Sequence, residues 1–118
     1  MSTKLLVYIG ESQNFDLEPT IQSILSIPNV SNALEGEFIG AVFECNYTYG
    51  DRTTVVRISE DLDVITIEGS GIEAVDFAIQ FQKSFQTALH IIDMDYSFDL
   101  NLSEFKTSAE LMTAVNGA

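Results

Sequence analysis

Three aspartates near the C-terminal end of the chain, Asp93, Asp95 and Asp99, have the side chains and the close spacing from which calcium sites are built. In an EF-hand loop, alternate positions supply oxygen ligands, a glycine at the sixth position makes the turn, and a glutamate at the twelfth completes the site. Counted from Asp93, the twelfth residue is Glu104, but the sixth is Phe98. We therefore interpret the aspartates as a solvated strand face or a partner-binding stripe and predict no metal.

Catalytic groupings are absent from the rest of the sequence. His90 is the only histidine, and no G-x-S-x-G turn places a nucleophilic serine for it to activate. Residues 69–71, Gly-Ser-Gly, open a predicted helix as phosphate loops do, but no basic residue is near, and Glu68 and Glu73 would repel the anion. We predict a protein that is not an enzyme, with no catalytic residues and no cofactor.

The strands that position these residues can be derived from two turns. Gly50-Asp51 fits a two-residue hairpin loop with glycine at a positive φ angle. A four-residue loop at residues 60–63 continues the same apolar face onto a third strand, and a shift of one residue would turn that face to solvent. The predicted pairs are Phe43 with Ile58, Glu44 with Arg57, Cys45 with Val56, Asn46 with Val55, Thr48 with Thr53, Val56 with Ile67, Arg57 with Thr66, and Ile58 with Ile65.

This three-stranded antiparallel meander, at about residues 38–68, has two different faces. The predicted core face consists of Ile39, Ala41, Phe43, Cys45, Tyr47, Val56, Ile58, Ile65 and Ile67. The predicted outer face consists of Glu44, Asn46, Thr48, Arg57, Thr66 and Glu68, and antiparallel sheets can expose such a face to solvent. Cys45 is the only cysteine, so we expect a buried thiol and no disulfide.

Periodicity and end signals predict the other elements. They are a strand at residues 4–9, a helix that begins near Asp16 or Glu18 and stops at Pro28, a loop at 29–36, a helix from a capping box at 70–73 to about residue 88, a strand at 89–100, and a helix from a capping box at 107–110 to Gly117. The first helix should bury Leu17, Ile21, Ile24 and Leu25.

The last predicted strand alternates along its length. We assign His90, Ile92, Met94, Tyr96, Phe98 and Leu100 to its core face and Ile91, Asp93, Asp95, Ser97 and Asp99 to its outer face. The whole chain then reads β-α-β-β-β-α-β-α. We predict a single α+β domain over residues 1–118, with a mainly antiparallel sheet and helices packed on one face. A crossover through the second helix should lay the last strand parallel to another strand of the sheet.

Charge is the compositional outlier. The chain has 18 acidic and 5 basic residues, for a formal net charge of -13. This field repels nucleic acid and anionic membranes and attracts basic proteins. We therefore predict a protein partner, no direct binding of nucleic acid and no membrane association. The apolar run at residues 5–9 is too short for a signal peptide or a membrane span, so we expect a cytoplasmic protein.

The acidic residues concentrate in two groups. One is the predicted hairpin tip, with Glu60, Asp61 and Asp63, and the other is the stripe of Asp93, Asp95 and Asp99. Crowded like charges repel one another, so folding stability gives no reason to collect them. We predict that both groups bind the partner.

The segment LHIIDMDYSFDLNLSEFKTSAELMTAV at residues 89–115, together with the small size and the acidity, resembles the C-terminal strand and helix of small acidic bacterial immunity proteins of interbacterial toxin systems. The resemblance implies a non-catalytic inhibitor that binds and neutralises a cognate toxin. Two other interpretations stay open: a small-molecule-binding regulatory module that acts through a homodimer, and an inhibitor that mimics the charge of nucleic acid.

Overall fold

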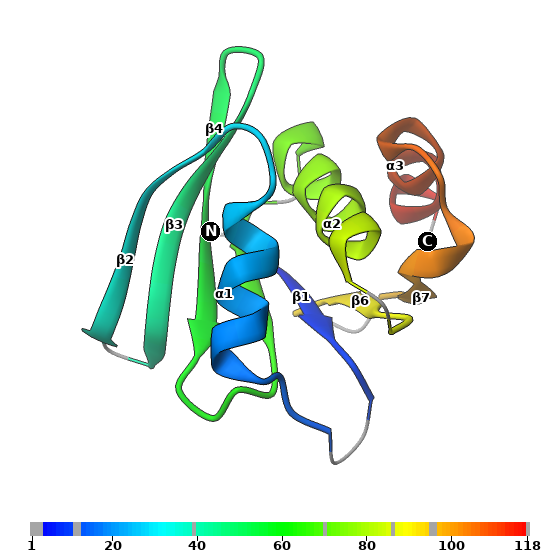
Figure 1. The fold of residues 1–118 in the computed structure, drawn as a ribbon. Helices are drawn as coiled ribbons and strands as arrows, with labels where there is room; N and C mark the ends of the chain where they lie inside the picture. The colour runs from blue at the N-terminus through cyan, green and yellow to red at the C-terminus, as the bar shows by residue number, and fades with distance from the viewer. Residues whose placement is uncertain are drawn as a thin grey trace.

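The computed structural model describes residues 4–10, 13–38, 40–69, 71–85, 87–94 and 97–117, which form three α-helices, a short 3-10 helix and one seven-stranded antiparallel sheet (Figure 1). In chain order the elements are β1 (Lys4–Tyr8), α1 (Leu17–Leu25), β2 (Val30–Phe38), β3 (Ala41–Tyr49), β4 (Arg52–Ser59), β5 (Ile65–Glu68), α2 (Ile72–Ser84), β6 (His90–Asp93), β7 (Asp99–Asn101), η1 (Leu102–Glu104) and α3 (Ser108–Asn116). The predicted α+β class is confirmed, and the predicted elements occur in the predicted order.

The first strand of the chain lies inside the sheet. The strand order is β2-β3-β4-β5-β1-β6-β7, and β1 pairs antiparallel with both β5 and β6. Consequently β5 and β6 run parallel to each other, joined by α2 and separated by β1. The predicted crossover is present, with β1 inserted between the two parallel strands.

The meander has the predicted register. All eight pairs derived from the two turns are observed, and Gly50 has a φ of 65°. The side chains predicted to face the core are buried, except that Ile39 lies outside the described residues. On the outer face Arg57 bridges two strands, since its guanidinium lies 2.8 Å from Glu68 and 3.6 Å from Glu44. The turn lengths therefore determine which side chains enter the core.

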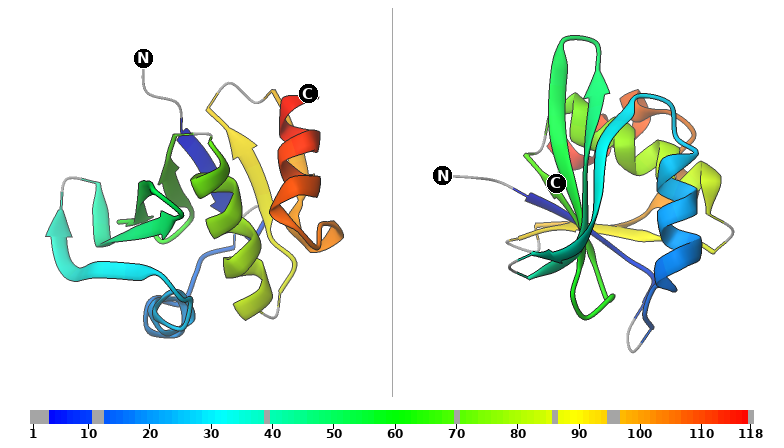
Figure 2. Two further views of the ribbon diagram at one scale, coloured as in Figure 1. Left: turned by 90° about the horizontal axis from the view of Figure 1, so that it is seen from above. Right: turned by 60° about the vertical axis from the view of Figure 1, so that its left-hand side comes forward.

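The core lies between the sheet and α2. This helix buries Phe77 and Phe81, whose stacked rings lie 6.0 Å apart, and the Tyr47 ring meets Phe77 edge-on. The three helices cover one face of the strongly twisted sheet, with α2 between α1 and α3 (Figure 2). Among the residues that the structure describes, no helix lies on the opposite face of the sheet.

The predicted loop at residues 29–36 is wrong, because this segment belongs to the edge strand β2. Its pairing with β3 shifts register twice, between Ser31 and Leu34 and between Glu35 and Phe38. Asn32 takes a φ of 52° within the first irregularity. Such bulges break the two-residue period that identifies a strand in sequence.

The predicted strand at residues 89–100 is a hairpin of two strands, β6 and β7. Ile91 is fully buried opposite Val7, whereas His90 lies on the outer face opposite Tyr8, so the predicted faces are wrong for β6. Met94, assigned to the core, is 56% exposed. The faces are correct for β7, where Asp99 is exposed. In the sequence, the alternation of apolar and polar residues continues through the connection between β6 and β7, so the pattern does not reveal the turn.

The C-terminal end of α2 is held by the side chain of Gln82, in the last turn of the helix. α2 stops at Ser84 rather than near residue 88, because the Gln82 amide accepts from the Leu89 backbone N–H at 2.8 Å and donates to the Thr87 carbonyl at 3.1 Å. The N-cap of α2 is Gly71, and Ser70 of the predicted capping box lies outside the described residues.

One prediction for α3 is confirmed and one for α1 is wrong. The capping box of α3 is confirmed, with both the Thr107 and the Glu110 bonds present. In α1, Leu25 is 46% exposed, contrary to its predicted burial.

Thiol labelling tests the register of the meander. Burial, reinforced by the charge of Glu44, raises the pKa of the Cys45 thiol to about 12. At pH 8 we expect native protein to resist an aromatic disulfide reagent, and labelling to accelerate with urea in step with unfolding. Fully denatured protein is the control for maximal rate. Fast labelling without denaturant would place Cys45 on the outer face and contradict the register.

Candidate functional site

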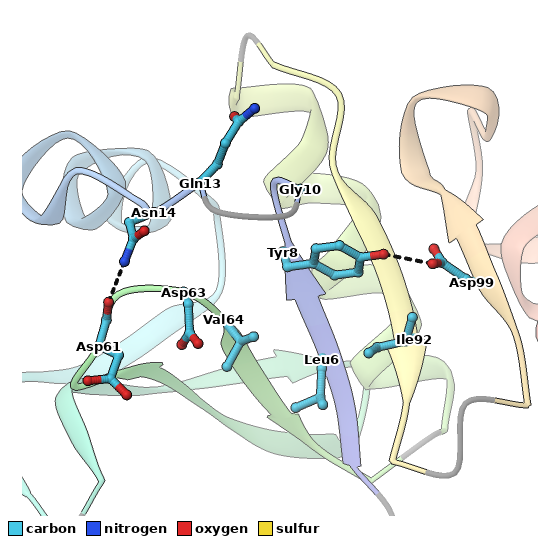
Figure 3. A pocket seen from close by; sticks show the side chains of 10 residues that line it. All are labelled: Leu6, Tyr8, Gly10, Gln13, Asn14, Asp61, Asp63, Val64, Ile92 and Asp99. Carbon is cyan, nitrogen blue, oxygen red and sulfur yellow. Dashed lines mark hydrogen bonds between the residues drawn. The ribbon is translucent and has the colours of Figure 1, made fainter.

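A groove of about 660 Å³ lies on the face of the sheet that no helix covers (Figure 3). Its lining comes from β1, from the connection that precedes α1, from the loop between β4 and β5, and from β6 and β7. The lining residues are Leu6, Tyr8, Gly10, Gln13, Asn14, Asp61, Asp63, Val64, Ile92 and Asp99. This groove is the candidate functional site, called the acidic groove below.

The floor of the acidic groove follows from strand register. Leu6 on β1 is paired with Ile92 on β6, and Ile92 is paired with Asp99 on β7, so all three side chains face the same side. Val64, just before β5, adds a further apolar group. The floor is therefore apolar, with carboxylates at its margins.

The loop between β4 and β5 forms one margin. Ser59 Oγ donates to Asp63 Oδ1 at 2.8 Å and accepts from the Asp63 and Val64 backbone N–H groups at 3.2 Å. Leu62 takes a left-handed φ of 61°, which a leucine adopts only at a cost in free energy. The loop conformation is thus held by a specific hydrogen-bond network, and Asp61 and Asp63 remain exposed.

The segment before α1 fastens this loop from the other side. The Phe15 backbone N–H donates to the Leu62 carbonyl at 2.7 Å, and the Asn14 amide donates to the Asp61 carbonyl at 2.6 Å. Phe15 itself is buried against Phe81 and Phe85. The acidic margin is therefore anchored to the core.

Asp99 forms the opposite margin. The Tyr8 hydroxyl donates to Asp99 Oδ2 at 2.7 Å, and His90 Nδ1 lies 3.5 Å from Asp99 Oδ1. The rings of Tyr8 and His90 stack, with centroids 5.1 Å apart. Tyrosine is a neutral donor at pH 7, and histidine compensates the carboxylate only when it is protonated. These contacts orient Asp99 and leave its side chain 53% exposed.

No lysine or arginine lines the acidic groove within the part of the chain that the structure describes. Three of the five basic side chains pair elsewhere: Lys4 and Arg57 with Glu68, and Arg52 with Glu73. The groove-lining residues also include no serine, threonine or cysteine that could act as a nucleophile. The described lining therefore combines apolar side chains with three carboxylates, Asp61, Asp63 and Asp99.

The two predicted acidic groups meet in part at this site. Asp61 and Asp63 from the hairpin tip face the same groove as Asp99. Glu60 is exposed at the tip but does not line the groove. Asp95 lies outside the described residues. The two groups are far apart along the chain, and the insertion of β1 between β5 and β6 brings Asp61, Asp63 and Asp99 to one groove.

The prediction of one stripe containing Asp93 and Asp99 is wrong. Asp93 is paired with the core residue Leu5, so it lies on the helix side of the sheet, and its Oδ1 accepts from the Ser97 backbone N–H at 2.7 Å. The chain reverses between β6 and β7, and this reversal changes the face of the later aspartate. Asp93 stabilises the hairpin connection rather than the groove.

Several groove residues were missed in the sequence. Tyr8 and Leu6 belong to a strand that the sequence predicts as buried, and only their alternation with Leu5 and Val7 marks them as outward-facing. Asn14 has no local pattern at all, because its role depends on the distant Asp61 carbonyl. Long-range pairing, not local composition, selects these residues.

Comparison with family models, with curated proteins and with solved structures finds no match for this chain. The residues that the structure describes contain no group of three or more His, Cys, Asp or Glu side chains arranged to hold a metal ion. None of their helices has the length and apolar character needed to cross a membrane.

The tip carboxylates provide a test that needs no partner. We expect the double variant Asp61→Asn, Asp63→Asn to unfold with a free energy equal to or slightly above that of the wild type, within about 0.5 kcal/mol. Asparagine keeps an acceptor for Ser59, and removing like charges relieves repulsion, more so at low salt. Urea unfolding at two ionic strengths measures this difference. A loss of more than about 1 kcal/mol would show that these carboxylates support the fold.

Proposed function

We propose that this protein is a non-catalytic binding protein that captures a basic segment of a protein partner in the acidic groove. The observation that carries the proposal is the convergence of Asp61, Asp63 and Asp99, from distant parts of the chain, around an apolar floor without a lysine or arginine in the described lining. An incoming basic side chain would compensate these charges and cover the floor with its methylene stem.

The geometry favours a protein ligand over a buried small molecule. The groove is open along the sheet surface, and Asp99 on its margin is half exposed. Small-molecule sites usually enclose most of the ligand surface. A side chain presented by a larger partner needs no enclosure, because neighbouring contacts exclude water from it. The net charge of -13 would also speed the encounter with a basic protein.

The finer proposal is that the partner is a toxin and that this protein is a cytoplasmic immunity protein of an interbacterial toxin system. Its support is the acidity, the small size and the resemblance of residues 89–115 to the C-terminal segments of such proteins. That segment supplies β6, β7 and α3, and therefore Asp99 of the groove. Inhibition by occupying a basic active site or substrate channel would require no catalytic group in the inhibitor.

Association kinetics test the groove directly. The partner is captured from the native cells with immobilised protein, and its binding is then compared for the groove variant Asp61→Asn, Asp63→Asn, Asp99→Asn. We expect association about tenfold slower at low salt, with a weaker salt dependence. The charge-matched control is Glu18→Gln, Glu35→Gln, Glu104→Gln, which removes three exposed carboxylates outside the groove. The association rate of this control should fall much less than that of the groove variant.

Equal rates for the groove variant and the wild type would refute the proposed site. Failure to recover a protein partner, combined with stabilisation by a metabolite, would favour the regulatory module. Competition between the partner and DNA would favour mimicry of nucleic acid. The toxin proposal has its own arm: expressing the captured partner alone should arrest growth, and co-expression of the wild type, but not of the groove variant, should restore it.

A further inference from the structure

A second cavity, of about 380 Å³, lies on the helix side of the molecule, separate from the acidic groove. Residues from the connection between α1 and β2, the β3–β4 hairpin and α2 form its walls, and in Figure 1 the connection passes beside the hairpin. A hydrogen bond from the Thr48 backbone N–H to the Asn29 carbonyl, at 3.2 Å, holds the connection against the hairpin. None of its lining residues is shared with the acidic groove.

Asp76, on α2, places a buried carboxylate in this cavity. The residue is 8% exposed, and its one hydrogen-bond partner among the described residues is the Tyr47 hydroxyl, which donates to Oδ2. Burial and the bond to Asp76 raise the pKa of Tyr47, so the phenol remains a neutral donor throughout the physiological range. A neutral donor satisfies one oxygen but does not compensate the charge.

Glu73, one turn earlier on the same helix, has a positively charged neighbour of the kind that Asp76 lacks among the described residues. It is also 8% exposed, and Arg52 from the β3–β4 hairpin places Nε 2.7 Å from its Oε2. The contact is an ion pair without the alignment of a hydrogen bond. α2 thus buries two carboxylates, of which one receives a cation from the chain and the other, in the part of the chain described, does not.

We propose that the Asp76 cavity binds a guanidinium or primary alkylammonium group. A buried carboxylate without a counter-charge is unfavourable, and an entering cation would supply the missing charge. Tyr47 and the 41% exposed Tyr49 supply aromatic rings for cation–π contact, and the Gln80 amide adds a polar group. The cation has two sources, a free amine and an Arg or Lys side chain of a protein partner.

Titration with free cations tests the site in the whole protein. Agmatine and butylammonium are added to ¹⁵N-labelled protein, and amide shifts are followed at Asn29, Tyr49, Gly50 and Gln80. We expect saturable shifts for wild type and affinity at least about tenfold lower for Asp76→Asn, the size of one charge-assisted hydrogen bond. Asparagine retains an acceptor for Tyr47, so this variant should fold. Glu104→Gln, which removes an exposed carboxylate outside both the Asp76 cavity and the acidic groove, is the matched control and should bind as wild type does.

The outcomes separate the two sources. If Asp76→Asn also lowers the affinity for the captured protein partner, and agmatine competes with that partner for binding, the cation is a side chain of the partner. If the partner binds Asp76→Asn normally while the free cations bind wild type, the source is a free amine. Absence of saturable shifts with both cations, or equal affinities for wild type and Asp76→Asn, overturns the proposal. The titrations with free cations are followed at the Asp76 cavity and do not depend on whether the acidic groove binds a partner.

Discussion

The strand register set by two short turns is the constraint on which the rest of the structure depends. The Gly50-Asp51 turn and the loop at residues 60–63 place Phe43, Ile58 and Ile65 side by side beneath the helices. The same pairing continues through β1 and β6 to β7, so the row that begins with Glu44 on β3 ends with Asp99 on β7. A shift of one residue at either turn would bury this row and expose the apolar one. The core and the acidic groove are thus two faces of a single pairing pattern.

The distribution of cations explains why the outer face is not uniformly repulsive. Near one end of the row, Arg57 lies between Glu44 and Glu68, and Lys4 adds a second positive charge beside Glu68 at 3.6 Å. Exposed pairs of this kind contribute little individually, but they neutralise that part of the sheet. At the other end, Asp61, Asp63 and Asp99 have no lysine or arginine beside them within the described lining. Carboxylates in one part of the outer face are therefore paired with basic side chains of the chain itself, whereas those of the acidic groove are not paired with lysine or arginine within the described lining.

The meander could be predicted because two turn lengths and two face patterns agree on one register, and each constraint is local. β2 could not, since its bulges and the left-handed Asn32 remove the alternation that marks a strand. The β6–β7 hairpin was concealed because apolar and acidic residues alternate across its connection. For the groove, acidity alone pointed to Asp61, Asp63 and Asp99, whereas Tyr8 and Asn14 become recognisable only when β1 is known to lie between β5 and β6. The buried Asp76 gave no signal, because a carboxylate on a helix is exposed by default.

Methyl NMR of the complex with the captured partner tests the central claim most directly, because the groove floor carries its own probes. Leu6, Val64 and Ile92 present methyl groups in the groove, while Leu25 and Leu34 are exposed elsewhere, at 46% and 59%, and serve as references. If the acidic groove receives a basic segment of the partner, the three floor residues shift or broaden on binding and the two references do not. Changes at Leu25 or Leu34, with Leu6, Val64 and Ile92 unperturbed, would contradict the account.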